Sequence, residues 1–172
     1  QPPPRKKSVS EPSKTTSSRP QGAHGSRSKG RELALKFLFG TDLRGRSDME
    51  VLDDFVVHQD ARGPSVDFAR ALIAGILETW EPLNGVIETM AKNWALHRMA
   101  TTDRNILRLG CYELLCKPET PAGVVINEAV ELAKKYGTSN SGAFVNGILD
   151  RIRNRRDEGE DLLALPESPP EP

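Results

Sequence analysis

The stretch from Pro121 to Asp150 constrains the fold more than any other part of the chain. Its first half repeats apolar residues at helical spacing, which places them on one stripe with polar residues opposite. Gly137 ends this pattern, and glycine readily takes the left-handed turn that closes a helix. A cluster of possible N-caps follows at residues 138–141, and a second apolar stripe begins at Phe144. The pattern predicts two helices joined by a polar corner, and two helices cannot bury both stripes alone.

Apolar stripes and chain breakers predict five more helices before this pair. We expect them at residues 31–43, 48–58, 65–80, 82–94 and 101–116. The last of these is apolar almost all round, which is typical of a central helix packed by several neighbours. No segment alternates apolar and polar residues strongly enough to predict a strand. We therefore expect an all-α fold, a single helical-bundle domain of about seven helices.

The two ends of the 172-residue chain are too polar to join this core. Residues 1–28 are rich in Pro, Ser, Lys and Arg, and residues 157–172 are acidic and rich in Pro, so we expect both tails to be disordered. The domain would then span residues 29–156. The chain has no net charge, but residues 1–31 carry eight Lys and Arg against one acid. A basic arm suits contact with a polyanion, and the alternative is an arm that only aids solubility.

Motifs for catalysis are absent from the sequence. We find no Gly-rich phosphate loop, nucleophile elbow, HExxH or CxxC pattern, so we expect neither enzyme activity nor a cofactor. Cys111 and Cys116 would point in different directions on a helix, which argues against a metal site or a disulfide and suits a reducing cytoplasm. No apolar run approaches the roughly 18 residues that a membrane span needs.

The basic residues Arg27, Lys29 and Arg31 alternate just before the first predicted helix. On a flexible lead, such residues can contact successive phosphates without reading bases. They are therefore candidate phosphate contacts, although basic tails are common.

The corner formed by Ser139, Asn140 and Ser141 is a second candidate phosphate contact. A polar helix N-terminus can donate hydrogen bonds to a phosphate, and Phe144, one turn later, offers an aromatic face to an unstacked base. The alternative is ordinary capping by Ser141 and a place in the core for Phe144.

Two other sets of residues suggest structural or protein contacts. Phe39 lies off the apolar stripe of the first helix, which suits an interface anchor, although neighbouring helices could equally bury it. Arg104, Arg108 and Glu113 interrupt an otherwise apolar helix, and we expect them to form buried ion pairs or caps.

These motifs together resemble the NusB family of transcription antitermination factors. The resemblance rests on INEAVELAKKYG followed by FVNGILD, on RNILR and YEL upstream, and on RELA near the start, in the family's order. It covers about residues 29–156. It implies a bundle of two packed sub-bundles, with three helices in one and four in the other.

The resemblance also implies partners. Family members bind single-stranded boxA-type RNA through a basic N-terminus and the polar corner with its aromatic residue. Some place an aromatic RNA contact at the position of Met90, where this chain could make only an apolar one. Phe39, Leu43 and Asp103 would face NusE, a small-subunit ribosomal protein. The complex would join RNA polymerase and other Nus factors, chiefly on ribosomal RNA transcripts.

Two alternatives from other classes remain open. A NusB-like domain also occurs as the RNA-binding module of an rRNA cytosine methyltransferase, which needs a large α/β domain after the bundle. The other alternative is a helical protein adaptor that has lost RNA binding, which the sparse arm and Met90 would suit.

Overall fold

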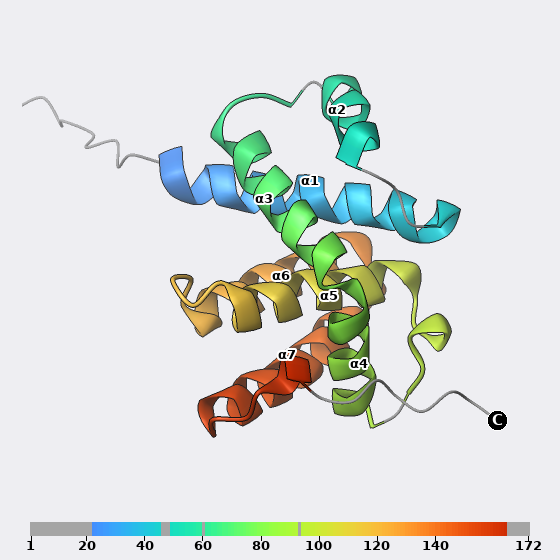
Figure 1. The fold of residues 1–172 in the computed structure, drawn as a ribbon, viewed down its shortest axis with the longest axis vertical. Coiled ribbons are helices and arrows are strands. Elements are labelled where there is room, and N and C mark those ends of the chain that lie inside the picture. The colour runs from blue at the N-terminus through green and yellow to red at the C-terminus, as the bar shows by residue number, and fades with distance from the viewer. Residues whose placement is uncertain (1–21, 46–48, 60, 93, 165–172) are drawn as a thin grey trace, which may run out of the picture.

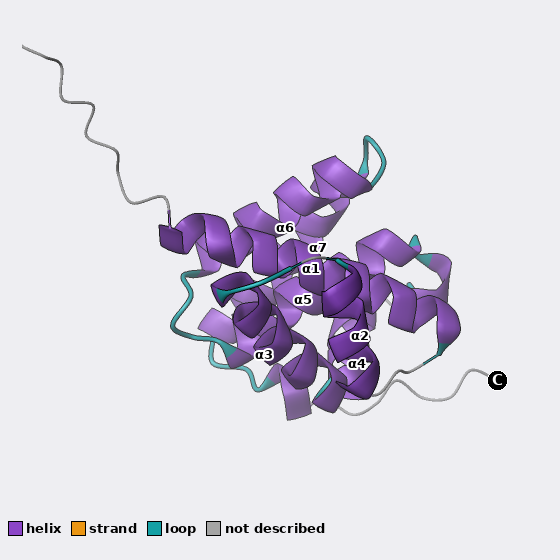
Figure 2. Cartoon of the chain, turned by 90° about the horizontal axis from the view of Figure 1, so that it is seen from above, coloured by secondary structure: helices purple, strands orange, loops and turns teal. Residues whose placement is uncertain are grey.

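The computed structural model describes residues 22–45, 49–59, 61–92 and 94–164. These residues form seven α-helices and two short 3-10 helices, and Figure 2 draws the described chain as helix and loop without a strand. The helices are α1 Gly22–Arg44, α2 Met49–His58, α3 Pro64–Glu78, α4 Trp80–Met90, η1 Leu96–Arg98, α5 Thr101–Cys116, α6 Ala122–Tyr136, α7 Ser141–Asp157 and η2 Leu162–Ala164. The prediction of an all-α bundle is confirmed.

Helix α5 is the centre of the bundle, as its all-round apolar pattern predicts. Its residues from Asn105 to Leu114 are all buried. It packs against α1 and α3 on one side and against α4, α6 and α7 on the other (Figure 1). The chain therefore forms two sub-bundles, α1–α3 and α4–α7, and α5 joins them.

A buried ion pair fixes α1 against α5. The Arg31 guanidinium donates from Nε to Glu113 Oε2 at 2.9 Å and from Nη2 to Glu113 Oε1 at 2.8 Å. Both side chains are almost fully enclosed. The two-pronged geometry matters because a charge taken out of water is costly unless it is paired and hydrogen-bonded.

A second ionic cluster joins the other end of α1 to the start of α5. Asp42 accepts hydrogen bonds from Arg104, from Asn105 at 2.9 Å and from Arg108 at 2.9 Å. Burial raises the pKa of Asp42, but the bonds from Arg104 and Arg108 outweigh it and lower that pKa. The Arg108 guanidinium also lies 4.0 Å from the centre of the Trp80 ring. The expectation of ion pairs on α5 is confirmed.

Helix α1 begins at Gly22, nine residues before the predicted start at Arg31. Gly30 lies so close to α3 that a Cβ atom there would stand 2.7 Å from the Phe68 ring, and Ser28 donates to Glu128 at 2.7 Å. These tertiary contacts offset the poor helix propensity of a glycine-rich stretch. The prediction that residues 22–28 are disordered is therefore wrong, and residues 1–21 lie outside the described residues.

The C-terminal boundary also differs from the prediction. Helix α7 continues to Asp157, and Leu162 in η2 is buried. Arg156 donates to the Leu114 carbonyl at 3.0 Å, which ties the end of α7 to α5. The prediction of a disordered tail is wrong for residues 157–164, and residues 165–172 lie outside the described residues.

The ion pair between Arg31 and Glu113 gives a stability prediction. Glu113→Ala should lower the free energy of unfolding by about 3–5 kcal/mol, because it leaves the Arg31 charge buried without a partner. The double variant Arg31→Met with Glu113→Leu should recover most of that loss. Urea unfolding measures both, with Glu131→Ala as a control that removes the exposed pair with Lys134. A loss below about 1 kcal/mol for Glu113→Ala would contradict the structural role of the pair.

Candidate RNA and partner interface

The first turns of α1 separate the three basic residues predicted to contact RNA. Arg27 and Lys29 are exposed, whereas the exposed fraction of Arg31 is 1 %. Arg27 and Arg31 are four residues apart and share a helix face, and both guanidinium groups lie over the Phe68 ring, at 5.7 and 5.2 Å. The prediction that Arg31 contacts a phosphate is wrong, because the core and Glu113 enclose its charge. Arg27 and Lys29 remain candidates.

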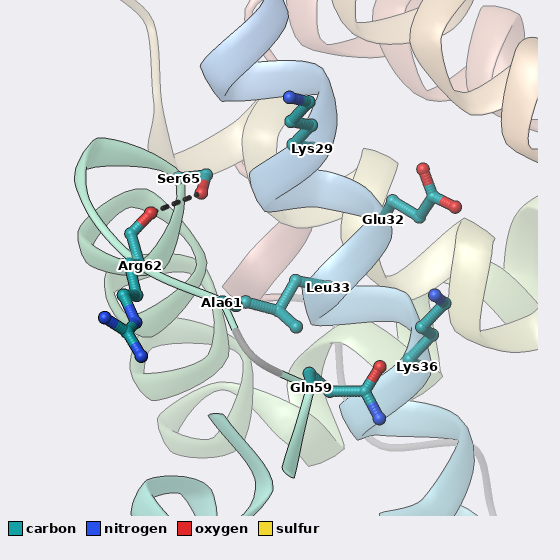
Figure 3. A pocket seen from close by; sticks show the side chains of 8 residues that line it. All are labelled: Lys29, Glu32, Leu33, Lys36, Gln59, Ala61, Arg62 and Ser65. Carbon is teal, nitrogen blue, oxygen red and sulfur yellow. Dashed lines mark hydrogen bonds between the residues drawn. The ribbon is translucent and has the colours of Figure 1, made fainter. Parts of the chain in front are cut away.

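An open groove of about 710 Å³ lies beside Lys29, between α1 and the start of α3. Figure 3 shows Lys29 and Lys36 on the α1 side and Arg62 on the other side. Three cations therefore line a groove that begins at the predicted RNA arm. A positive groove of this kind attracts a polyanion.

Glu32 connects this groove to the end of α6. Its carboxylate accepts hydrogen bonds from Lys135 at 2.7 Å and from the Tyr136 hydroxyl. Burial raises the pKa of Glu32, but the bonds from Lys135 and Tyr136 outweigh it and lower that pKa. Because Lys135 balances the carboxylate, Lys29 and Lys36 give the α1 side of the groove an excess of positive charge.

The corner between α6 and α7 differs from the predicted geometry. Gly137 is extended, with φ −93° and ψ −162°, rather than left-handed. Its missing side chain matters for space, because a Cβ atom would lie 2.4 Å from Ser141 Oγ. Ser141 is buried, and its Oγ accepts a hydrogen bond from the Thr138 backbone N–H at 2.9 Å. The prediction that Ser141 contacts RNA is therefore contradicted, whereas Ser139 and Asn140 are exposed.

Asn140 stands at the N-terminus of α7 and leaves it open to an anion. Its side chain makes no capping hydrogen bond, and the first turn of α7 has no acidic residue. The unpaired N–H groups and the positive end of a helix dipole favour negative charge at such a place. Ser139 and Asn140 therefore stay predicted phosphate contacts.

Met90 is buried, although it was predicted to contact RNA. Its exposed fraction is 4 %, its carbonyl accepts a hydrogen bond from Arg151 at 2.7 Å, and its sulfur lies 4.0 Å from the Arg155 guanidinium. The prediction that Met90 contacts RNA is contradicted, because it is the last residue of α4 and its side chain joins the core.

Trp94 is the aromatic residue that the sequence pattern did not single out for binding. The pattern placed it on the apolar stripe of a helix to residue 94, but α4 ends at Met90 and half of the Trp94 side chain is exposed. Its ring meets that of Phe144 edge to face, with 6.0 Å between centres. Phe144 itself is half-buried. The signal in the sequence that could have indicated this exposed ring is a large aromatic residue, Trp94, at the very end of the predicted apolar stripe.

Two of the predicted partner residues, Phe39 and Leu43, lie in the last turns of α1. Phe39 and Leu43 are one turn apart, with exposed fractions of 38 % and 62 %. Phe39 and Thr102 line a pocket of about 290 Å³, and Asp103 follows Thr102 in the chain. Within the described residues, Asp103 Oδ1 is enclosed and has no hydrogen-bond partner. An apolar anchor beside an unsatisfied acceptor suits a protein partner, and this role stays a prediction.

The described residues contain no cluster of His, Cys, Asp and Glu that could hold a metal ion. Burial raises the pKa of both the Cys111 and Cys116 thiols, which makes them poor nucleophiles. None of the helices in the described ranges is long and apolar enough to cross a membrane.

Comparisons with known proteins agree with the fold and the motifs. The model of the NusB family matches residues 28–154. A transcription antitermination protein NusB of Sorangium cellulosum (strain So ce56) is 44% identical over 128 residues, which cover 74% of this chain and 91% of that protein. The protein of the same description from Elusimicrobium minutum (strain Pei191) is 43% identical over 141 residues, which cover 80% of this chain and 99% of that protein.

Solved structures give the same result. T. maritima NusB has a TM-score of 0.69 and 40% identity, with 74% of this chain and 90% of that chain covered. A chain in the crystal structure of the antitermination factors NusB and NusE in complex with dsRNA has a TM-score of 0.70 and 29% identity, with 76% and 98% covered. The family match covers most of the chain, and the predicted resemblance is confirmed: this chain belongs to the NusB family.

Proposed function

We propose that the chain is a transcription antitermination factor that binds boxA-type single-stranded RNA together with NusE. The observation that carries this proposal is the match to relatives described as transcription antitermination protein NusB over 91% and 99% of their length. The protein would act by binding and not by catalysis, in the cytoplasm, within an RNA polymerase complex that contains other Nus factors.

The geometry supports two separate binding regions on α1, one at each end of the helix. Its first turns present Arg27 and Lys29 beside the basic groove, where phosphates would bind. Its last turns present Phe39 and Leu43 beside Asp103, where NusE would bind. The direct test measures RNA affinity by fluorescence anisotropy, with and without NusE. If the chain binds NusE but no RNA, the result favours the protein adaptor. If the chain binds neither NusE nor RNA, the proposed function is wrong.

The methyltransferase alternative is less well supported. That enzyme needs a large α/β domain besides the bundle, whereas the relatives named here are matched over nearly their whole length by a helical domain alone. An activity assay for methyl transfer to RNA, expected to be negative, would test this directly.

The basic arm gives the first functional prediction. Arg27→Ala with Lys29→Ala should weaken RNA binding and flatten the dependence of log affinity on log salt by about 1.4, or about 0.7 for each lost phosphate contact. The control Arg70→Ala removes a cation on α3 that is ion-paired to Asp53, and it should keep the slope. An unchanged slope in the double variant would reduce the arm to an aid to solubility.

Phe39 gives a prediction for NusE. Phe39→Asp should abolish pairing with NusE in size-exclusion chromatography, because it puts a charge at an apolar contact. The melting temperature should stay close to that of the wild type, since the side chain is partly in solvent. Val57→Asp is the matched control, because Val57 on α2 has an exposed fraction of 77 %. A large loss of stability in Phe39→Asp would show that Phe39 belongs to the core.

Asn140 gives a prediction that separates folding from binding. Asn140→Asp should change the free energy of unfolding by no more than about 0.5 kcal/mol, because Asn140 is exposed and Asp is an equally good N-cap. RNA affinity should fall several-fold at low salt, because the new charge repels phosphate, and the difference should shrink as salt screens it. Asn127→Asp, on the exposed face of α6, is the control. Equal RNA affinity at low salt would remove the corner from the binding surface.

A further inference from the structure

One carboxylate, that of Glu32, lies among three lysines where α1 meets the end of α6. Glu32 accepts a hydrogen bond from Lys135 Nζ at 2.7 Å and another from the Tyr136 hydroxyl. Lys36 is one helical turn after Glu32 on α1, and Lys29 is one turn before it. Figure 3 shows the Glu32 carboxylate and the Lys36 amine turned to the same side of α1. The carboxylate is therefore an anion surrounded by cationic and hydroxyl donors.

The ion pair between Glu32 and Lys135 contributes little to the stability of the fold. The exposed fractions of the two side chains are 60 % for Lys135 and 26 % for Glu32. Ion pairs as exposed as this one add little to stability, because water solvates and salt screens both charges. The enclosed pair of Arg31 and Glu113 already fixes α1 in the bundle. The bonds of Glu32 therefore suit a role at the surface.

This cluster lies between the two regions that are predicted to contact phosphate. Lys29 is exposed in the first turns of α1, and Ser139 and Asn140 follow the end of α6. Lys135 belongs to the last turn of α6, directly before that corner. A contiguous path from Lys29 to the corner runs through the bond between Glu32 and Lys135. An RNA strand that contacts both regions would lie over this bond.

The groups that bind the Glu32 carboxylate are equally suited to a phosphate. A carboxylate and a phosphodiester are both anions with oxygen acceptors, and an ammonium or a phenol hydroxyl can donate to either. Lysine acts as a compact point charge, so it does not require the planar shape of a carboxylate. Glu32 is also the single carboxylate among the described residues that line the basic groove. Without its charge, only cations and neutral groups would face the RNA there.

We propose that Lys135, Lys36 and the Tyr136 hydroxyl form a binding site for one RNA phosphate, and that the Glu32 carboxylate occupies this site in the free protein. When RNA binds, the Glu32 side chain turns aside and the phosphate takes over its hydrogen bonds. Glu32 therefore competes with RNA and lowers the affinity of the protein. The inference rests on the proposed RNA-binding function, and it adds a phosphate site and the residue that controls access to it.

Glu32→Gln tests the competition, because it removes the charge and keeps the shape of the side chain. Lys135 is then open to RNA, so the dependence of log affinity on log salt for a boxA-type single-stranded RNA should steepen by about 0.7, as for one added phosphate contact. This slope corresponds to a gain of about fivefold in affinity for each tenfold dilution of salt. Glu119→Gln, in the exposed connection at the opposite end of α6, makes the same change in net charge and should keep the slope.

A double-mutant cycle distinguishes competition from a role in positioning. Lys135→Ala should lower RNA affinity more in the Glu32→Gln background, where the ammonium is open to phosphate, than in the wild type, where Glu32 must first release it. If the bond only positions α6 against α1, Glu32→Gln alone weakens RNA binding, and Lys135→Ala adds little to that loss. Melting temperatures should stay near that of the wild type in every variant, because the pair is exposed.

The outcomes separate this site from the proposed function. Wild-type protein without measurable affinity for RNA would contradict both. If the wild type binds RNA and Glu32→Gln has equal or lower affinity with an unchanged salt slope, the phosphate site alone is wrong. Additive effects of Glu32→Gln and Lys135→Ala would contradict the competition between Glu32 and RNA.

Discussion

The ion pair between Arg31 and Glu113 determines how the first helix lies on the central one, and the outer surface depends on that placement. Both charges are enclosed, so any rotation of α1 that parts them would leave two unpaired charges in the core. Lys29 is therefore held on the open side of α1, facing the groove shared with Arg62. One basic residue of the arm, Arg31, fixes the helix, and Lys29 stays exposed as a predicted phosphate contact.

The ionic cluster around Asp42 fixes the other end of α1 against α5. Asp42 holds Arg104, Asn105 and Arg108 of α5, so the end of α1 and the start of α5 keep one relative position. Phe39 lies one turn before Asp42 on α1, and Asp103 directly precedes Arg104 on α5. Phe39 and Asp103 are 64 positions apart in the chain, and this cluster fixes the ends of the two helices that carry them. Mutations in this cluster would shift the helix ends that carry Phe39 and Asp103 without changing either residue.

Hydrophobic periodicity predicted much of the fold, because apolar residues that recur at helical spacing show both that a segment is helical and which of its faces is buried. The central place of α5 and the pair formed by α6 and α7 follow from that pattern alone. The start of α1 could not be predicted, since its glycine-rich turns have poor helix propensity and their contacts with Phe68 and Glu128 come from distant parts of the chain. The error over Arg31 has the same origin. Alternating charges suggest an extended arm, but in a helix the spacing of four puts Arg27 and Arg31 on one face.

The candidate site shows the limit of periodicity most clearly at the end of α4. A stripe from Leu83 to Trp94 continues at the right spacing, so the sequence predicts one apolar face and hides the point where the helix stops. The helix stops at Met90, and the left-handed turn at Lys92 sends Trp94 away from the core and onto Phe144. Helical spacing then no longer says where a side chain points. An aromatic residue that pattern alone assigns to the core becomes a half-exposed ring at the surface, and its position follows from the turn and not from the stripe.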